Sequence, residues 1–390
     1  MTPSVLMFCP QFRPLVGGAE RQAEKLSKAL VQRGLCVTVL TPHLVGDSPE
    51  YEEDSGVVIH RFPLFDLCKR FPMVPGLGPV NLVALSIQTR RAVIKFVDTH
   101  DIVHAHGVSA LTAFGLSATR KANKPFICKL ASSGAGFDLR KLSDIGIGGQ
   151  FLANYLRDHV TAWVATCNAV TESLKEYGVP QKRIVQIPNG VELPKQDASR
   201  NPPRNCSNVR RLLYVGRLSR SCDRDFETLF DAFSHLAAKY EDLELALVGE
   251  GDLFDSLKTS ASHSAFALRV HMPGLVKDPT EWFEWADCFV LPSRREGMSN
   301  SLIEAMAFGL VCIANDIAAN REVLEDGKAG YLTAVGDVGK LIANLERLIT
   351  LGDGSIQIGK KAAARAQQEY AIETVALKYQ TAYEHVACKA

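Results

Sequence analysis

The sequence predicts an α/β protein of two domains, each built on a parallel sheet covered by helices on both faces. Short runs of apolar and β-branched residues alternate with helical stretches along the chain, a pattern typical of strands joined by helical crossovers. The chain has 390 residues, which is enough for two or three domains of ordinary size. A polar stretch without periodicity, rich in Pro and Asn, interrupts the alternation at 192–208.

The first half contains six predicted strands. The first is followed by Gly17-Gly18 and by a periodic helical stretch from Ala19 to Arg33. Pro188-Asn-Gly190 then marks a turn, so we assign residues 1–188 to an N-terminal Rossmann-like domain. The six strands are Val5–Phe8, Cys36–Leu40, Ile102–His104, Phe126–Leu130, Trp163–Ala165 and Ile184–Ile187.

The alternation restarts after the polar stretch. We therefore predict a linker at 189–209 and a second Rossmann-like domain at 210–390, whose last helix is expected to return to the first domain. Doubly wound sheets bind ligands beyond the carboxyl ends of their strands. The predicted strands of this half are Arg211–Val215, Glu244–Val248, one at Val270, Cys288–Leu291, Val311–Ala314 and Gly330–Thr333.

Composition excludes several classes of protein. With 46% hydrophobic and 22% charged residues the chain is not disordered as a whole. A net charge of +1 argues against a generally basic nucleic-acid binder, so no nucleic-acid partner is expected. The N-terminus lacks the pattern of a secretory signal and the apolar stretch 74–87 is broken by Pro and Gly, which predicts a cytoplasmic protein. None of the ten cysteines forms a C-x-x-C pair, and those in apolar runs, such as Cys36 and Cys288, are expected to be buried thiols.

Charge is divided unevenly between the two halves. Residues 1–188 carry 21 Lys and Arg against 15 Asp and Glu, whereas the rest carries 23 against 28. Part of the N-terminal excess lies at Lys69-Arg70, within an aromatic and apolar segment from Phe62 to Val74. A solvated face explains this pattern simply. The alternative is a peripheral contact with an anionic membrane, on the inner face of the plasma membrane, or with an anionic acceptor.

The densest cluster of functional residues follows the predicted strand Cys288–Leu291. Glu296 would lie beyond the carboxyl end of this strand, and a helix is predicted to begin near Asn300 or Ser301. A helix start offers free N–H groups and a positive dipole end, which suit a phosphate. Glu304 would project from the first turns of the helix toward the same place. Two simpler interpretations stay open: Ser301-Leu-Ile-Glu304 fits a capping box, and Glu296 could be a solvated loop carboxylate.

Two further loops have the composition of phosphate sites. Arg217 and Arg224 bracket the loop that follows the strand Arg211–Val215, and two guanidinium groups there would suit a diphosphate, although both could be surface charges. Gly17-Gly18 stands at a predicted helix start. Neither this pair nor Gly249-Glu-Gly251 completes G-x-G-x-x-G, so a nicotinamide cofactor is not predicted.

A pair of histidines ends one strand of the first half. His104 and His106 would point to the same face of the strand if its pleat continues to His106. With no carboxylate or third histidine close by in sequence, we do not predict a metal site.

Taken together, these motifs resemble those of the retaining glycosyltransferases of family 4, which have the two-domain GT-B fold with the donor in an interdomain cleft. The E-x7-E signature of that family resembles Glu296 and Glu304. The resemblance also covers Gly-Gly-Ala-Glu (17–20), Asp-Ile-Val-His-Ala-His-Gly (101–107), Ile-Pro-Asn-Gly-Val (187–191), Val-Gly-Arg-Leu (215–218) and Asn-Arg-Glu-Val-Leu-Glu-Asp-Gly (320–327).

The resemblance implies a role for each of these residues. Arg217 would grip the donor diphosphate, Glu304 would accept the ribose hydroxyls, and Glu296 and His106 would act at the donor sugar as the catalytic pair. Gly297 and Met298 would also contact that sugar, whereas Gly18, Ser299, Asn300 and Ser301 would serve the diphosphate. The family has a Lys about five residues after the Arg, where this chain has Cys222. A two-residue insertion would make Arg224 the substitute cation.

The resulting prediction is a retaining glycosyltransferase that acts in bacterial surface polysaccharide assembly. Its donor would be a UDP- or GDP-sugar and its acceptor a saccharide or a lipid-linked sugar. No metal cofactor is expected, because two arginines and a helix start would stabilise the leaving group. Two alternatives are a nucleotide-sugar 2-epimerase, which would release a free epimerised nucleotide sugar, and a catalytically silent nucleotide-sugar-binding module, against which both glutamates and both arginines argue.

Overall fold

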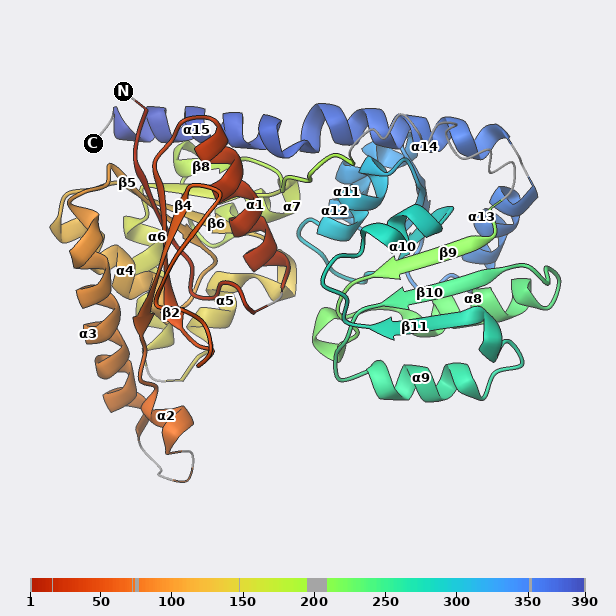
Figure 1. Cartoon of the computed structure of the whole chain (residues 1–390), viewed down its shortest axis with the longest axis horizontal. Helices are drawn as coiled ribbons and strands as arrows, with labels where there is room; N and C mark the ends of the chain where they lie inside the picture. Colours follow the sequence, from red (N-terminus) through yellow and green to blue (C-terminus); the bar gives the residue numbers. More distant parts are fainter. Residues whose placement is uncertain are drawn as a thin grey trace. The chain divides into compact units, whose positions relative to one another are not determined.

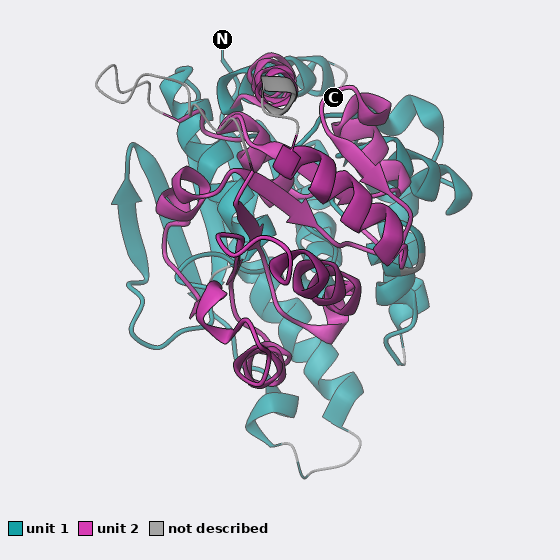
Figure 2. Cartoon of the chain, turned by 90° about the vertical axis from the view of Figure 1, so that its right-hand side faces the viewer, with its two compact units in different colours: residues 1–190, 372–390 teal, residues 191–371 magenta. Residues whose placement is uncertain are grey.

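A computed structural model shows an α/β chain that divides into two units (Figure 1). Unit 1 comprises residues 1–190 and 372–390, and unit 2 comprises residues 191–371 (Figure 2). The sequence-based division placed 372–390 in the second domain. The structure describes residues 2–15, 17–71, 73, 77–146, 148–194, 209–350 and 353–388. Most of the predicted linker, 195–208, and Val74 of the basic segment lie outside the described residues.

Unit 1 contains a sheet of eight strands in the order β3-β4-β2-β1-β5-β6-β7-β8. All neighbouring strands are parallel except β3 and β4. The order reverses direction at β1, so the loops after β1 and β5 flank the place where such sheets bind ligands. The strands are β1 (Val5–Phe8), β2 (Val37–His43), β3 (Tyr51–Asp54), β4 (Val57–Pro63), β5 (Ile102–His106), β6 (Phe126–Leu130), β7 (Ala162–Ala165) and β8 (Ile184–Gln186).

Helices cover both faces of this sheet. Phe8 points to one face of the sheet, where Gly115 lies against both Phe8 and Val93. Met7 points to the opposite face, because successive residues of a strand alternate between the two faces. The neighbours of Phe8 belong to α3 and α4, whereas α1 and α15 cover the opposite face. The helices are α1 (Gly18–Gln32), α2 (Leu67–Arg70), α3 (Leu77–Val97), α4 (Ala110–Lys121), α5 (Asp138–Ser143), α6 (Gly149–His159), α7 (Asn168–Glu176) and α15 (Ile372–Ala387).

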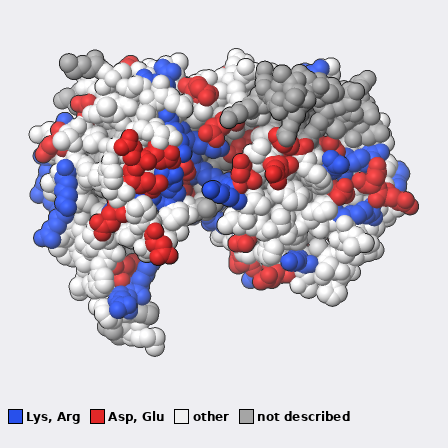
Figure 3. Space-filling view, in the orientation of Figure 1, with Lys and Arg blue, Asp and Glu red and all other residues white. Residues whose placement is uncertain are grey.

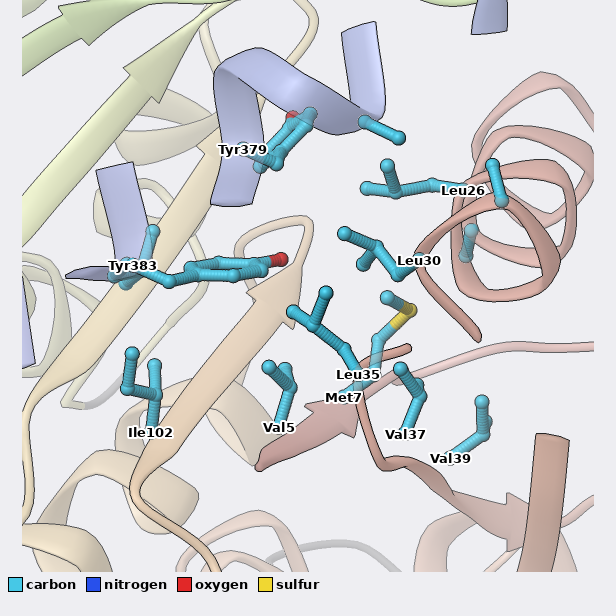
Figure 4. Close-up of a cluster of buried hydrophobic side chains, with 14 of the residues drawn as sticks. Val5, Met7, Leu26, Leu30, Leu35, Val37, Val39, Ile102, Tyr379 and Tyr383 are labelled. Carbon is cyan, nitrogen blue, oxygen red and sulfur yellow. The ribbon is translucent and has the colours of Figure 1, made fainter. Parts of the chain in front are cut away.

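The core between α1, α15 and the sheet is assembled from both ends of unit 1. Figure 4 shows Leu26 and Leu30 of α1 together with Tyr379 and Tyr383 of α15, next to strand residues such as Met7. Leu30, Met7 and both tyrosines have no exposed surface. The last helix is therefore an integral part of the core of unit 1.

The hairpin β3–β4 was not among the predicted strands, and it makes the sheet mixed rather than wholly parallel. Its two strands are joined at Ser55 and Gly56, which both have positive φ, as a tight hairpin turn requires. The sequence Asp-Ser-Gly followed by Val-Val-Ile (54–59) is a hairpin signal that the strand predictions missed. A second expectation was wrong at Cys36, which precedes β2 and is exposed, whereas Cys288 is buried.

Unit 2 contains six parallel strands in the order β11-β10-β9-β12-β13-β14. This is the Rossmann order, which changes direction between β9 and β12. The strands are β9 (Arg211–Val215), β10 (Glu244–Val248), β11 (Val270–Gly274), β12 (Cys288–Leu291), β13 (Val311–Asn315) and β14 (Tyr331–Thr333). The helices are α8 (Phe226–Ala237), α9 (Phe254–Ser262), α10 (Thr280–Trp285), α11 (Asn300–Ala307), α12 (Ala318–Val323), α13 (Val338–Thr350) and α14 (Asp353–Arg365), the last of which continues through a π-helical turn, η7 (Ala366–Tyr370).

The predicted fold class, two α/β units on largely parallel sheets, is confirmed. All twelve predicted strands are found, with ends shifted by a few residues. Within the described part of the chain, no helix has both the length and the apolar composition needed to cross a bilayer.

Candidate functional site

The loop after β9 carries Arg217 and is shaped by close contacts between backbones. Gly249 and Gly251, in the loop after β10, lie directly against the carbonyl oxygens of Gly216 and Leu218, where a Cβ atom would collide. The Leu218 N–H donates to the Glu250 carbonyl oxygen at 2.9 Å. These glycines, which in the sequence fit only an incomplete dinucleotide motif, therefore permit the approach that fixes the Arg217 loop.

Arg217 and Arg224 differ sharply in their surroundings. The side chain of Arg217 is exposed, and its guanidinium has no hydrogen bond or ion pair among the described residues. Arg224 is only 11% exposed in its side chain, and its Nη2 forms an ion pair with Glu296 Oε1 at 2.5 Å. Arg217 is thus available to an incoming anion, whereas Arg224 is engaged within the protein.

The loop after β12 leads into α11, whose start is capped by Ser299. The Ser299 hydroxyl accepts a hydrogen bond from the Leu302 N–H at 3.3 Å, and Asn300 and Ser301 are the first two helical residues. The capping-box alternative for Ser301 and Glu304 is therefore wrong. The cap is Ser299 and not Ser301, and the third helical residue, where a capping box needs a Glu or Gln, is Leu302. Glu304 lies further along the helix and is half-buried.

The pKa of Glu296 reflects two opposing influences. Burial raises the pKa of its carboxyl above the usual range, and the charge and hydrogen bond of Arg224 act in the opposite direction. Gly297 and Met298, the next two residues, are buried.

Tyr214 of β9 lies next to Arg224, whose Nε donates to the Tyr214 hydroxyl. Burial raises the pKa of Tyr214 to about 12, so this hydroxyl stays protonated. It donates to the Arg217 carbonyl oxygen at 3.1 Å.

The loops after β9 and β12 are joined along their length. Arg224 and Ser293 form an antiparallel bridge. On either side of Arg224, Asp223 forms an ion pair with Arg295 at 2.7 Å and Asp225 forms one with Arg294 at 3.0 Å. Asp223-Arg-Asp225 has the Asp-x-Asp spacing of a metal motif. Each carboxylate pairs with an arginine, and Asp225 also caps α8.

In unit 1, Gly18 begins α1 directly after the loop that follows β1. The N-cap residue is Gly17, which has no side chain of its own to form a capping hydrogen bond. The nearby Gly190 is held by Gln22, whose side chain donates to the Gly190 carbonyl oxygen at 2.8 Å and accepts from its N–H at 3.0 Å. The N-terminal turn of α1 is therefore tied to the turn Pro188-Asn-Gly190.

His106 ends β5 in a buried cluster of basic side chains. The rings of His104 and His106 lie 4.4 Å apart, which confirms that both point to the same face. His104 Nδ1 is 2.7 Å from the Tyr383 hydroxyl, and Lys129 of β6 is the register partner of His106. Within the described chain, His106 Nε2 has no hydrogen-bond partner.

Burial disfavours the charged form of each group in this cluster. It lowers the pKa of Lys129 to about 7 and, together with the charge of Lys129, lowers the pKa of His104 to about 3. The pKa of His106 is well below its usual value because of burial, followed by the charges of His104 and Lys129. His106 is therefore a neutral imidazole at physiological pH.

The structure thus places the predicted residues at two positions. Arg217, Arg224 and the segment from Glu296 to Glu304 all follow the neighbouring strands β9 and β12 of unit 2, whereas Gly18 and His106 follow β1 and end β5 of unit 1. Among the described residues, no group of three or more His, Cys, Asp or Glu is arranged to hold a metal ion.

Several known proteins are similar along nearly the whole chain. The phosphatidyl-myo-inositol mannosyltransferase of Mycolicibacterium smegmatis is 26% identical over 390 residues, which cover 98% of this chain and 93% of that protein. The UDP-Gal:alpha-D-GlcNAc-diphosphoundecaprenol alpha-1,3-galactosyltransferase of Escherichia coli is 24% identical over 87% of this chain and 86% of that protein.

Solved structures show the same fold. The sucrose-phosphate synthase of Thermosynechococcus elongatus has a TM-score of 0.77 at 18% identity, with 99% of this chain and 100% of that chain covered. Anabaena Alr3699/HepE in complex with UDP and glucose has a TM-score of 0.74 at 18% identity, with 98% and 99% covered.

Two family models match, and together they cover more than half of the chain. Residues 16–195 match the model described as Glycosyltransferase Family 4, and residues 209–351 match the one described as Glycosyl transferases group 1. The order and extent of the matches agree with the motifs found in the sequence and with the two α/β units. The chain therefore belongs to family 4 of the glycosyltransferases, and it is an enzyme that transfers glycosyl groups.

Proposed function

We propose that the enzyme transfers a sugar with retention of configuration from a UDP- or GDP-sugar to a saccharide or lipid-linked acceptor, in the assembly of a bacterial surface polysaccharide. The observation that carries the donor assignment is the guanidinium of Arg217, which has no partner among the described residues. Arg217 follows β9, whose neighbour β12 leads to the start of α11. A guanidinium and a helix start are two recurrent ligands of phosphate. Two relatives support the acceptor class, since their names specify a phosphatidylinositol and a diphosphoundecaprenol-linked sugar.

In the proposed reaction the bond between the anomeric carbon and the diphosphate breaks, and the acceptor oxygen bonds to that carbon from the same face. The acceptor proton passes to the departing phosphate oxygen. Arg217 and the N-terminal turn of α11 stabilise the charge that develops on the diphosphate, which removes the need for a metal ion. Glu304 accepts the ribose hydroxyls, Glu296 accepts hydroxyls of the sugar, and the neutral His106 contributes a hydrogen bond to the sugar.

The function is tested by incubating the purified protein with a panel of UDP- and GDP-sugars. We expect slow donor hydrolysis with water as acceptor, faster release of nucleoside diphosphate with a lipid-linked sugar acceptor, and a product that keeps the anomeric configuration of the donor. The same turnover is expected in EDTA. Loss of activity in chelator with recovery in Mg²⁺ or Mn²⁺ would contradict the metal-independent step. A released epimerised nucleotide sugar, or tight binding without turnover, would instead identify an epimerase or a binding module.

Arg217→Ala is expected to weaken the binding of nucleoside diphosphate. A charge-assisted hydrogen bond to phosphate contributes about 1.5–3 kcal/mol, so the dissociation constant should rise by roughly 10- to 150-fold. Isothermal titration of UDP and GDP measures this change. Cys222→Ala, in the same loop, is the control and should leave the affinity within about twofold. An unchanged affinity in Arg217→Ala would remove Arg217 from the diphosphate site.

Glu304→Ala and Ser299→Ala should affect different properties: Glu304→Ala should mainly weaken nucleotide binding, and Ser299→Ala should mainly lower stability. Because Ser299 caps α11, its loss should lower stability by about 1 kcal/mol. Glu304 lies outside the cap, so its loss should mainly raise the dissociation constant for nucleoside diphosphate. Melting curves measure the stability of both variants, and titrations with UDP and GDP measure their dissociation constants. If Glu304→Ala melted earlier but bound nucleotide normally, the ribose contact would be wrong.

We further propose that the surface around α2 and α3 contacts an anionic membrane. Residues at helical spacing on α3 form an exposed apolar stripe, with Val83 60% and Ile87 46% exposed. Met73, in the loop between the two helices, is 91% exposed. Basic side chains flank this apolar surface: Lys69 and Arg70 on α2, and Arg91 and Lys95 on α3. Figure 3 shows blue side chains gathered around α2.

The segment that carries Lys69 and Arg70 is held on α3 by two polar side chains. Gln88 accepts from the Phe65 N–H at 2.7 Å, and Asn81 accepts from the Leu67 N–H at 2.7 Å. Apolar side chains of this surface would enter the interface, while each basic residue near lipid phosphates contributes about 1 kcal/mol.

Co-sedimentation with vesicles containing anionic lipid tests this surface. Binding should decrease with salt, and Lys69→Glu/Arg70→Glu should decrease it further, because both charges then repel the lipid. The control is Lys360→Glu/Lys361→Glu, which makes the same charge change on α14, where both lysines are exposed. Equal recovery in the supernatant with and without anionic lipid would leave only the interpretation of a solvated face.

A further inference from the structure

We propose that Arg224 positions the carboxylate of Glu296 for the sugar instead of binding the donor diphosphate. This inference rests on the proposed function, and it replaces the expectation that Arg224 substitutes for the family Lys. The starting observation is the ion pair between Arg224 Nη2 and Glu296 Oε1, which joins the loop after β9 to the loop after β12.

The guanidinium of Arg224 is held from several sides. Its Nη1 donates to the Cys222 carbonyl oxygen at 2.9 Å and to the Arg295 carbonyl oxygen at 3.3 Å, and its Nε donates to the Tyr214 hydroxyl at 3.4 Å. Together with the bond to Glu296, four of its five N–H donors are engaged. A group bound in this way cannot turn toward a phosphate without giving up several contacts.

The backbone fixes where this guanidinium lies. The Asp225 N–H donates to the Pro292 carbonyl oxygen at 2.7 Å, and the Arg294 N–H donates to the Asp223 carbonyl oxygen at 2.9 Å. These bonds surround the bridge between Arg224 and Ser293. The ion pairs of Asp223 and Asp225 with the arginines of the second loop reinforce the same register. The two segments therefore behave as one short paired element that carries Arg224 and Glu296 side by side.

The chemistry explains why an arginine stands here. A planar guanidinium can hold two backbone oxygens and a carboxylate at once in a fixed orientation, whereas an ammonium group is a compact point charge without such a fork. A carboxylate that is oriented in this way presents its oxygens to hydroxyl groups of a sugar with little loss of freedom on binding. Arg217 remains the diphosphate cation, since it is exposed and unpaired in the described structure.

The experiment compares Arg224→Gln, Arg224→Lys and Arg217→Ala with the control Arg220→Gln, which removes an exposed charge from the same loop. UDP and GDP are titrated first, followed by turnover at saturating donor. Both Arg224 variants should bind nucleoside diphosphate within about twofold of the wild type and lose tenfold or more in kcat. Arg217→Ala should instead lose affinity. Arg224→Lys should not restore turnover, because an ammonium group keeps the positive charge but lacks the planar guanidinium that holds several oxygens at once.

The pH profile supplies a readout that a merely structural role would not move. The ionised carboxylate of Glu296 is a stronger hydrogen-bond acceptor for sugar hydroxyl groups than the protonated acid, so activity should fall as pH falls through its pKa. Arg224 lowers this pKa against the effect of burial. The other ionisable groups around Arg224 are Tyr214 and Cys222, and the neighbouring carboxylates Asp223 and Asp225 are paired with Arg295 and Arg294. Removing Arg224 should therefore raise the pKa of Glu296 and shift the acid limb to higher pH. In the control Arg220→Gln, the acid limb of the pH–activity profile should lie at the same pH as in the wild type.

Amide hydrogen exchange of the protein without donor gives an independent measurement. In Arg224→Gln the peptide spanning 292–297 should exchange faster than in wild type and Arg220→Gln, with unchanged exchange in the strands of unit 2. The inference is overturned if Arg224→Gln raises the dissociation constant for UDP and GDP tenfold at unchanged kcat, or if neither exchange nor turnover changes. Failure of the proposed function would appear differently, as a wild-type protein that binds and turns over no nucleotide sugar.

Discussion

Neighbouring parallel strands end at the same edge of a sheet, and this constraint places the loop after β9 of unit 2 beside the loop after β12. Because the strand order reverses between them, no helical crossover separates the two loops. They can therefore pair through the bridge between Arg224 and Ser293. This adjacency sets the position of Arg224 in one loop relative to Glu296 and the start of α11 in the other.

Much of this arrangement could be predicted from the sequence. Apolar runs separated by helical periodicity located twelve strands, because a buried parallel strand must be nearly continuous in apolar residues. Residues that follow such strands, including Arg217 and Glu296, were assigned to the ligand-binding edge on this basis. The histidine pair was also correctly placed on one face, since alternation along a strand is fixed by its pleat.

Side-chain partners were harder to predict, because pairing depends on which loops meet in space. The sequence shows Arg224 only as a cation in a loop, and its bond to Glu296, 72 residues away in the chain, has no local signal. The same reason explains the failure to interpret Gly249 and Gly251, whose role depends on the carbonyl groups of another loop. The capping box failed for a different reason: Ser299 and Ser301 both fit a cap, and only the helix start distinguishes them.

The position of α15 has a consequence for how the enzyme folds during synthesis. Tyr379 and Tyr383 complete the core against α1, yet the ribosome makes them only after all of residues 191–371. Until then, the apolar face of the sheet that α15 covers has no partner from this helix, and His104 lacks the hydroxyl that it contacts in the finished protein. Unit 2 is complete in sequence before unit 1 is, so the half that begins first is the last to acquire its full core.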